Sequence, residues 1–170
     1  SMGSGYQQLR AGRWSAKGHI YFVTFNTRDR RKIFSDAAIA TDAGRLIHET
    51  GQRLDGVAIA WVLMPDHWHG LIDVGSGISL SAYVGRLKGA VSRRLRLLHP
   101  HLPTIWQDGF HDHAIRRSES IDTIAAYLLM NPLSAPSRRL ARTLVLASPL
   151  LLAYVAAGWM RLSDPPLRVA

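Results

Sequence analysis

Residues 56–74 read GVAIAWVLMPDHWHGLIDV, and this stretch carries the clearest fold signal in the chain. Residues 56–63 are rich in β-branched, aromatic and small apolar side chains, as is typical of a strand. Met64-Pro65-Asp66 has the composition of a tight turn, and residues 67–74 resume the strand pattern. The stretch therefore predicts a β-hairpin.

The segments on either side of the hairpin extend it into a larger α+β unit. Residues 19–26 predict a strand, and Ser35-Asp36 offers an N-cap to a helix that Gly51 ends. A second helix begins at Ser79, residues 110–116 predict a fourth strand, and residues 118–130 predict a third helix stopped by Asn131-Pro132. The apolar stripe of the second helix comprises Leu80, Tyr83, Val84, Leu87, Val91, Leu95 and Leu98. The order βαββαβ predicts a ferredoxin-like antiparallel sheet with its crossover helices on one face.

Length and charge limit the class of protein. The chain has 170 residues, no Cys and a formal charge of +9, with 21 Lys and Arg against 12 Asp and Glu. One domain fits this length, and the absence of Cys excludes disulfide scaffolds and thiol nucleophiles and fits a cytoplasmic protein. The positive charge favours nucleic acid as partner, with an anionic membrane second.

Three regions divide the chain. Residues 1–5 resemble a tag scar, residues 6–135 form the predicted domain, and residues 136–170 predict a helical extension that packs on the domain or on a partner subunit. No charge falls between Arg142 and Arg161, but Ser148-Pro149 interrupts this apolar run. We therefore expect no membrane span.

Three His-x-His pairs are candidates for chemistry. On a strand, both imidazoles of such a pair lie on one face and can share a divalent cation. His99/His101 lies in a Pro-containing loop, where solvated side chains are the simpler interpretation, whereas His67/His69 and His111/His113 lie on predicted strands. Trp68 should point to the opposite face and anchor its strand in the core.

Two further groups lie on predicted helices. Tyr127 and Asn131 are one turn apart and share a helix face, where a phenol near a cation could act as a nucleophile and an amide oxygen could complete the metal shell. The second helix also carries a basic face, which is either a solvated surface or a phosphate contact. Its members are Arg86, Lys88, Arg93, Arg94 and Arg96.

Four blocks of the chain resemble the HUH single-tyrosine transposases, and most closely the REP-associated tyrosine transposases. The blocks span residues 62–71, 87–93, 106–113 and 127–132, and the resemblance covers about residues 15 to 135. It implies an HUH endonuclease fold, in which an added C-terminal helix bears the nucleophile. It also implies that His67, His69 and Asn131 are ligands of Mg or Mn and that Tyr127 is the nucleophile.

The resemblance further implies the substrate and the reaction. Such enzymes cleave single-stranded DNA beside an imperfect hairpin through a 5′-phosphotyrosine, and another 3′-OH can reverse the step. Asp66 stands where the family often has Asn, which places an extra negative charge beside the metal. His111 and His113 fall in a family block and could brace the site or touch DNA. Both monomers and dimers are compatible with the family, and a bacterial cytoplasmic, nucleoid-associated location is expected.

Three other functions fit the sequence less well than strand transfer. A hairpin-DNA-binding module without turnover would be expected to lose part of the set His67, His69, Tyr127 and Asn131, yet all four are present. An RNA-binding domain of the RRM type requires a Lys/Arg-Gly-Phe/Tyr motif, which the chain lacks. A hydrolase based on the His pairs alone would need carboxylates, and the strands offer few beyond Asp66 and Asp73.

Overall fold

The computed structural model describes residues 20–115 and 146–147, and these form one sheet and one helical layer. Two 3₁₀ turns, Arg28–Arg30 and Ile33–Ser35, lie between the first strand and the first long helix. The strands and long helices in chain order are β1 (Ile20–Asn26), α2 (Ala37–Gly51), β2 (Val57–Met64), β3 (His67–Asp73), α3 (Leu80–Leu98), β4 (His111–Ala114) and β5 (Leu146–Ala147).

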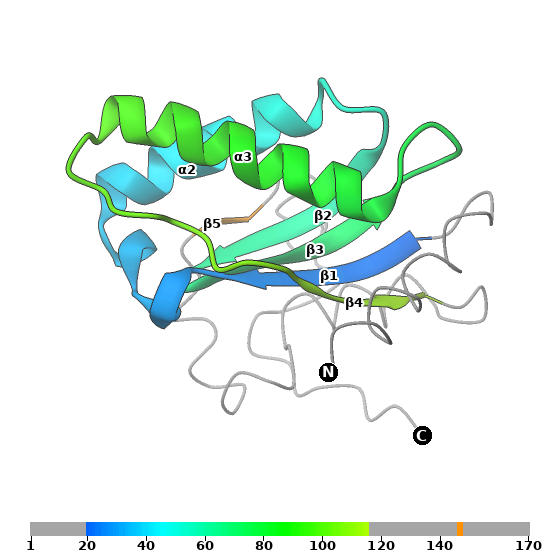
Figure 1. The fold of residues 1–170 in the computed structure, drawn as a ribbon, viewed down its shortest axis with the longest axis horizontal. Coiled ribbons are helices and arrows are strands. Elements are labelled where there is room, and N and C mark those ends of the chain that lie inside the picture. The colour runs from blue at the N-terminus through cyan, green and yellow to red at the C-terminus, as the bar shows by residue number, and fades with distance from the viewer. Residues whose placement is uncertain (1–19, 116–145, 148–170) are drawn as a thin grey trace, which may run out of the picture.

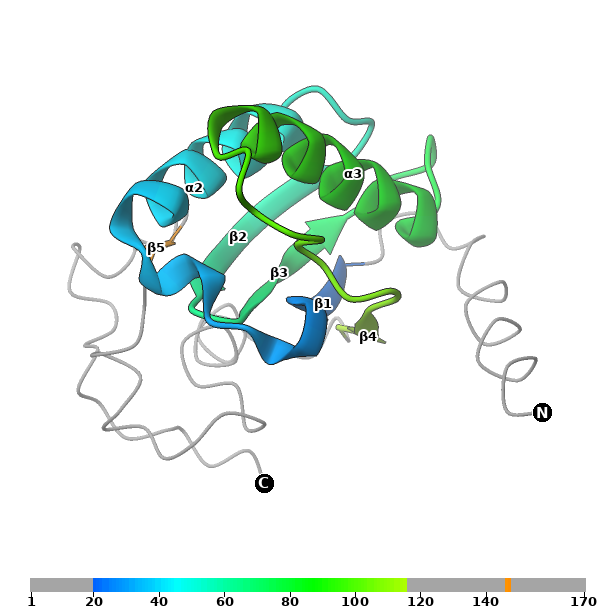
Figure 2. The same cartoon turned by 60° about the vertical axis from the view of Figure 1, so that its left-hand side comes forward.

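The sheet is antiparallel and its strands lie in the order β4-β1-β3-β2-β5. Figures 1 and 2 show α2 and α3 side by side on the same face of this sheet. The first four strands and the two helices confirm the predicted ferredoxin-like α+β arrangement. The predicted hairpin is β2-β3, and a bulge between Ala58 and Ala60 shifts its register once.

The two long helices begin where the sequence predicts. The Asp36 carboxylate accepts hydrogen bonds from the backbone N–H groups of Ala38 and Ile39, and the Ser79 hydroxyl accepts one from Ala82. Each cap satisfies donors that have no partner within the helix itself. The predicted apolar stripe of α3 is buried from Tyr83 to Leu95, whereas Leu98 at the end of the helix is 50% exposed, so its predicted burial is wrong.

Trp68 anchors β3 under the helices, as predicted. Its side chain is fully buried, and its ring stacks on Phe25 at 4.7 Å between centroids. Trp106 meets Phe25 edge-on at 4.8 Å. A Cβ at Gly70 would lie 2.6 Å from the Trp68 ring and 2.7 Å from Trp61 Cβ, so glycine at this position makes room for the indole. The -Trp-His-Gly- sequence is therefore partly a packing motif.

The C-terminal part of the prediction is only partly within the described residues. The sequence predicts a helical extension over residues 136–170, but its two described residues, Leu146 and Ala147, form a short strand on the free edge of β2. The predicted third helix, with Tyr127 and Asn131, lies outside the described residues. Within residues 20–115, neither long helix has the length and apolar character needed to cross a membrane.

Candidate functional site

His67 and His69 lie on the sheet face opposite the helices. Both follow the tight turn on β3, and Trp68 between them points into the helix-covered core. Their ring planes are inclined at 28° with centroids 5.3 Å apart, and both side chains are almost completely buried. The prediction that His67 and His69 lie on one face of the strand is thus confirmed.

Asp66 holds His67 in a defined orientation. Asp66 Oδ1 lies 2.7 Å from His67 Nδ1, and the other ring nitrogen, Nε2, is buried without a hydrogen-bond partner among the described residues. Burial lowers the pKa of His67, and the hydrogen bond to Asp66 opposes this effect only in part. The ring is therefore neutral near pH 7, and if Nδ1 donates to Asp66, Nε2 carries a free lone pair.

Arg30 accompanies Asp66 and was not predicted as part of the site. Its guanidinium lies 3.1 Å from Asp66 Oδ2 and donates a 2.7 Å hydrogen bond to the side-chain oxygen of Asn26. The extra negative charge that Asp66 introduces, in place of the Asn that the family often has, is thus paired with Arg30. Because Arg30 and Asp66 are 36 positions apart, only their opposite charges could have suggested the contact.

The geometry of the β2-β3 turn depends on the loop after β1. Thr27 is fully buried, and its backbone N–H donates to the Asp66 carbonyl at 2.9 Å. Its hydroxyl lies 3.0 Å from the same carbonyl and 2.7 Å from the carbonyl of Arg31. Asp29 and Arg30 both adopt a positive φ of 55°, which is uncommon for residues other than glycine. The loop is therefore held in a strained form that places Arg30 beside Asp66.

His111 and His113 lie on β4 on the same sheet face as the first pair. In the register, β1 lies between the two pairs, and Thr24 is opposite both His69 and His111. The His113 ring packs 5.4 Å from Phe22, which in turn lies 5.9 Å from the His69 ring. Both side chains of the β4 pair are exposed, unlike His67 and His69. Their position permits a contact with a ligand that lies across this face.

The residues on this face fit a divalent cation only in part. Among residues 20–115 and 146–147, no cluster of three or more His, Cys, Asp or Glu side chains could hold a metal ion. Nε2 of His67, which is buried without a hydrogen-bond partner among the described residues, and the adjacent His69 could supply two imidazole donors, and a metal ion bound there would need further donors. Mg²⁺ prefers oxygen ligands, so two imidazoles suit it less well than they suit cations that readily accept nitrogen.

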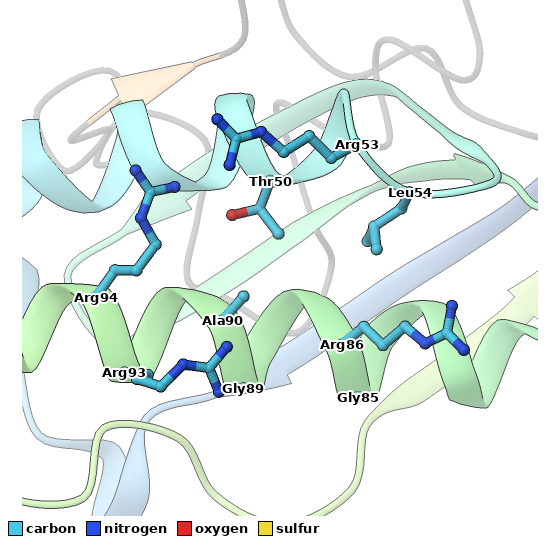
Figure 3. Close-up of a pocket in the computed structure, with 9 residues that line it drawn as sticks. All are labelled: Thr50, Arg53, Leu54, Gly85, Arg86, Gly89, Ala90, Arg93 and Arg94. Carbon is cyan, nitrogen blue, oxygen red and sulfur yellow. The ribbon is translucent and has the colours of Figure 1, made fainter.

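The basic residues of α3 do not share one environment. Lys88 donates to the backbone carbonyls of Gln107 and Gly109 at 2.7 and 2.8 Å, so it ties α3 to the loop before β4. Arg86, Arg93 and Arg94 line a groove between α2 and α3 (Figure 3), whereas Arg96 is exposed and lies outside this groove. The predicted basic face of α3 thus has three parts. Lys88 has a structural role, Arg86, Arg93 and Arg94 line the groove, and Arg96 lies on the surface outside it.

His99 differs from the solvated loop side chain expected at this position. Its Nε2 lies 2.7 Å from Asp42 Oδ2, and only 16% of its side chain is exposed. The contact joins the end of α3 to α2, and it lowers the pKa of Asp42. His101 is exposed, as predicted. The His99/His101 pair therefore lies at the end of α3, on the helix side of the sheet, and away from the face that carries His67.

Comparisons with known proteins assign the family. The family model described as "Transposase IS200 like" matches residues 14–131, so the chain belongs to this transposase family. A solved structure of a REP-associated tyrosine transposase bound to a REP hairpin is similar, with 21% identity, a TM-score of 0.66, and 91% of this chain and 90% of that chain covered.

A second solved structure, of a protein from Deinococcus radiodurans assigned as a transposase, has 20% identity and a TM-score of 0.54. The match covers 60% of this chain and 82% of that chain. At these identities the two structures support the fold alone. A comparison with curated proteins finds no match.

Proposed function

We propose that this protein cleaves and rejoins single-stranded DNA beside a hairpin, with Tyr127 as the nucleophile and His67, His69 and Asn131 as ligands of Mn²⁺ or Mg²⁺. The observation that carries the proposal is the buried His67/His69 pair, in which Asp66 orients His67 and leaves Nε2 unpartnered among the described residues. A neutral imidazole with an available lone pair is the form that binds a metal ion. Membership of the transposase family supports the same reaction class.

The proposed reaction proceeds by displacement at phosphorus. The Tyr127 hydroxyl gives up its proton to solvent as its oxygen bonds to the scissile phosphorus, the bond from phosphorus to the 3′ oxygen breaks, and that oxygen takes a proton from solvent and leaves as a 3′-OH. Bound at His67, His69 and Asn131, a divalent cation would polarise the phosphate and stabilise its developing charge. Attack by a different 3′-OH on the phosphotyrosine restores Tyr127 and joins two strands.

We propose a hairpin as the substrate because the similar REP-associated tyrosine transposase is bound to a REP hairpin in its structure. The chain's charge of +9 is consistent with a DNA partner. The reaction would take place on DNA in the bacterial cytoplasm. A module that binds hairpins without cleaving them is the alternative, and the dependence of cleavage on Tyr127 separates the two functions.

A covalent-adduct assay tests the proposal. The protein is mixed with end-labelled, single-stranded hairpin DNA and Mn²⁺ or Mg²⁺, and a denaturing gel reveals any protein-DNA adduct. We expect an adduct that chelation of the metal abolishes, that Tyr127→Phe lacks, and that the matched control Tyr154→Phe retains. The double variant His67→Ala/His69→Ala should also lack it. Tight DNA binding without an adduct over a range of hairpins would replace the enzyme with the binding module.

A further inference from the structure

The loop after β1 is joined to the β2-β3 turn by backbone hydrogen bonds. Figure 1 shows the two segments at the same end of the sheet. The Asp66 carbonyl accepts from the Thr27 backbone N–H at 2.9 Å, and the Pro65 carbonyl accepts from the Phe34 backbone N–H at 3.0 Å. Thr27 also forms an isolated β-bridge with Trp106. The fold therefore fixes the position of this loop relative to the turn that carries Asp66.

Arg30 extends from this loop and bridges two acceptors. Its Nη1 donates a 2.7 Å hydrogen bond to Asn26 Oδ1, and its Nη2 lies 3.1 Å from Asp66 Oδ2. Asn26 is the residue of β1 that pairs with His67 in the sheet register. A planar guanidinium holds two oxygen acceptors in one fixed geometry, which the flexible ammonium group of a lysine does not. Arg30 is thus anchored on the strand position opposite His67.

The backbone of the loop adopts an unusual conformation where it presents Arg30. Asp29 and Arg30 both have a φ of 55°, in the left-handed region that residues other than glycine rarely adopt. Such conformations persist only where the surrounding structure holds them, and they cluster at functional sites. Because the Arg30 side chain remains 50% exposed, burial alone does not explain the strain. The contacts with Asn26 and Asp66 are what this conformation provides.

All three oxygens of Asp66 are engaged by neighbouring residues. Oδ1 lies 2.7 Å from His67 Nδ1, Oδ2 lies beside Arg30, and the carbonyl accepts from Thr27. A carboxylate that was free to turn would itself attract a divalent cation, because such cations prefer oxygen ligands. It would also leave Nδ1 of His67 without its partner, and the ring proton could then move to Nε2. The contact with Arg30 opposes both changes.

We propose that Arg30 is a positioning residue that selects Nε2 of His67 as the nitrogen that binds the metal ion. Arg30 acts through Asp66: it holds Oδ2, and this keeps Oδ1 on Nδ1 and fixes the proton of the neutral ring there. Carboxylate partners orient histidine ligands in this way, and here an arginine from another element in turn orients the carboxylate. The inference rests on the proposed function for the presence of a metal ion, but the tautomer of His67 is a property of the metal-free protein.

The tautomer of His67 is the first test. Long-range hydrogen–nitrogen NMR correlations of the metal-free protein near neutral pH show which ring nitrogen carries the proton, and His67→Gln assigns the signal. Wild type should show one tautomer, protonated at Nδ1. Arg30→Ala should show a mixture, and Arg30→Lys, which keeps the charge but loses the planar fork, should lie between the two.

Arg31→Ala is the matched control for these variants. Arg31 belongs to the same loop and is 51% exposed, but it lies 3.5 Å from Asp29 rather than beside Asp66. It therefore matches Arg30 in charge and exposure and differs in its partner. This control should retain the wild-type tautomer of His67.

Binding of Mn²⁺ to the DNA-free protein is the second test, measured by the loss of the paramagnetic signal of free Mn²⁺. Loss of a positive charge near the site would by itself strengthen cation binding. We expect the opposite for Arg30→Ala, a weakening of at least about fivefold, because the orientation of the ligand is lost. Arg31→Ala should stay within about twofold of wild type. In the Asp66→Ala background, Arg30→Ala should cause no further weakening, since Arg30 acts only through Asp66.

Three results would overturn the proposal: a wild-type His67 protonated at Nε2, a single Nδ1-protonated tautomer in Arg30→Ala, or Mn²⁺ binding by Arg30→Ala at least as tight as that of wild type. Circular dichroism shows whether each variant is folded. If Arg30→Ala does not fold, Arg30→Lys decides by the same two readouts. Failure of wild type to form the Tyr127 adduct would instead overturn the proposed chemistry, and it would leave the tautomer result intact.

Discussion

Asp66 Oδ1 and His67 Nδ1 lie 2.7 Å apart across adjacent residues of the β2-β3 turn. Arg30 pairs with the other carboxylate oxygen, and Thr27 anchors the Asp66 carbonyl, so both the charge and the position of Asp66 are fixed. Carboxylate-histidine pairs of this kind orient metal ligands and increase their basicity. Asp66 is thus a positioning residue for His67 in the proposed metal site.

Replacing Asp66 should therefore separate orientation from charge. Asp66→Asn keeps an oxygen that can accept from His67 Nδ1, whereas Asp66→Ala removes it. We expect Asp66→Ala to raise the Mn²⁺ concentration for half-maximal adduct formation by about tenfold or more, and Asp66→Asn to change it by only a few fold. Thermal unfolding without metal is the control, because a purely structural role would lower stability without changing the metal dependence. Equal metal dependence in wild type and Asp66→Ala would contradict this assignment.

Gly70 provides a second test, of the packing around the candidate site. Gly70→Ala would place a Cβ within 2.8 Å of the Trp68 ring and the Trp61 Cβ, so these side chains must shift. We expect a loss of about 1–3 kcal/mol in the free energy of unfolding, measured by urea denaturation. Gly85→Ala is the matched control, since its Cβ meets no atom within 4 Å and alanine favours the helix. Equal stability of Gly70→Ala and wild type would show that the indole moves freely.

The sequence predicted features that depend on local patterns, but it did not predict contacts between distant residues. The period of two placed His67 and His69 on one face and Trp68 on the other, and local capping rules located Asp36 and Ser79. Contacts between distant residues had no local signal: Lys88 with the 107–109 loop, Arg30 with Asp66, and His99 with Asp42. The two-residue strand β5 was missed because its pairing with β2 is tertiary and its length is too short for a periodic pattern.

The contact between Asp42 and His99 predicts a dependence of stability on acid pH. The hydrogen bond from His99 is the main cause that lowers the pKa of Asp42 below its ordinary value of 3.8. A lowered carboxyl pKa adds stability above the unfolded-state pKa, and this stability is lost as the pH falls through the folded-state pKa. Asp42→Asn should therefore unfold at a lower temperature than wild type near pH 6, and the difference should shrink as the pH falls below about 4. A difference independent of pH would contradict the ionic origin.

Tyr83 predicts the opposite dependence, at alkaline pH. Its ring packs beneath Gly56, and burial raises the pKa of its hydroxyl from 10.0 to about 12. Because the folded state disfavours the phenolate, the stability contributed by the neutral hydroxyl is fully present below pH 10 and is lost as the pH rises towards 12. The shift corresponds to about 2–3 kcal/mol at most. We expect the free energy of unfolding of wild type, measured by urea denaturation, to fall more steeply above pH 10 than that of Tyr83→Phe. Parallel curves for the two proteins would show that the hydroxyl ionises without resistance from the fold.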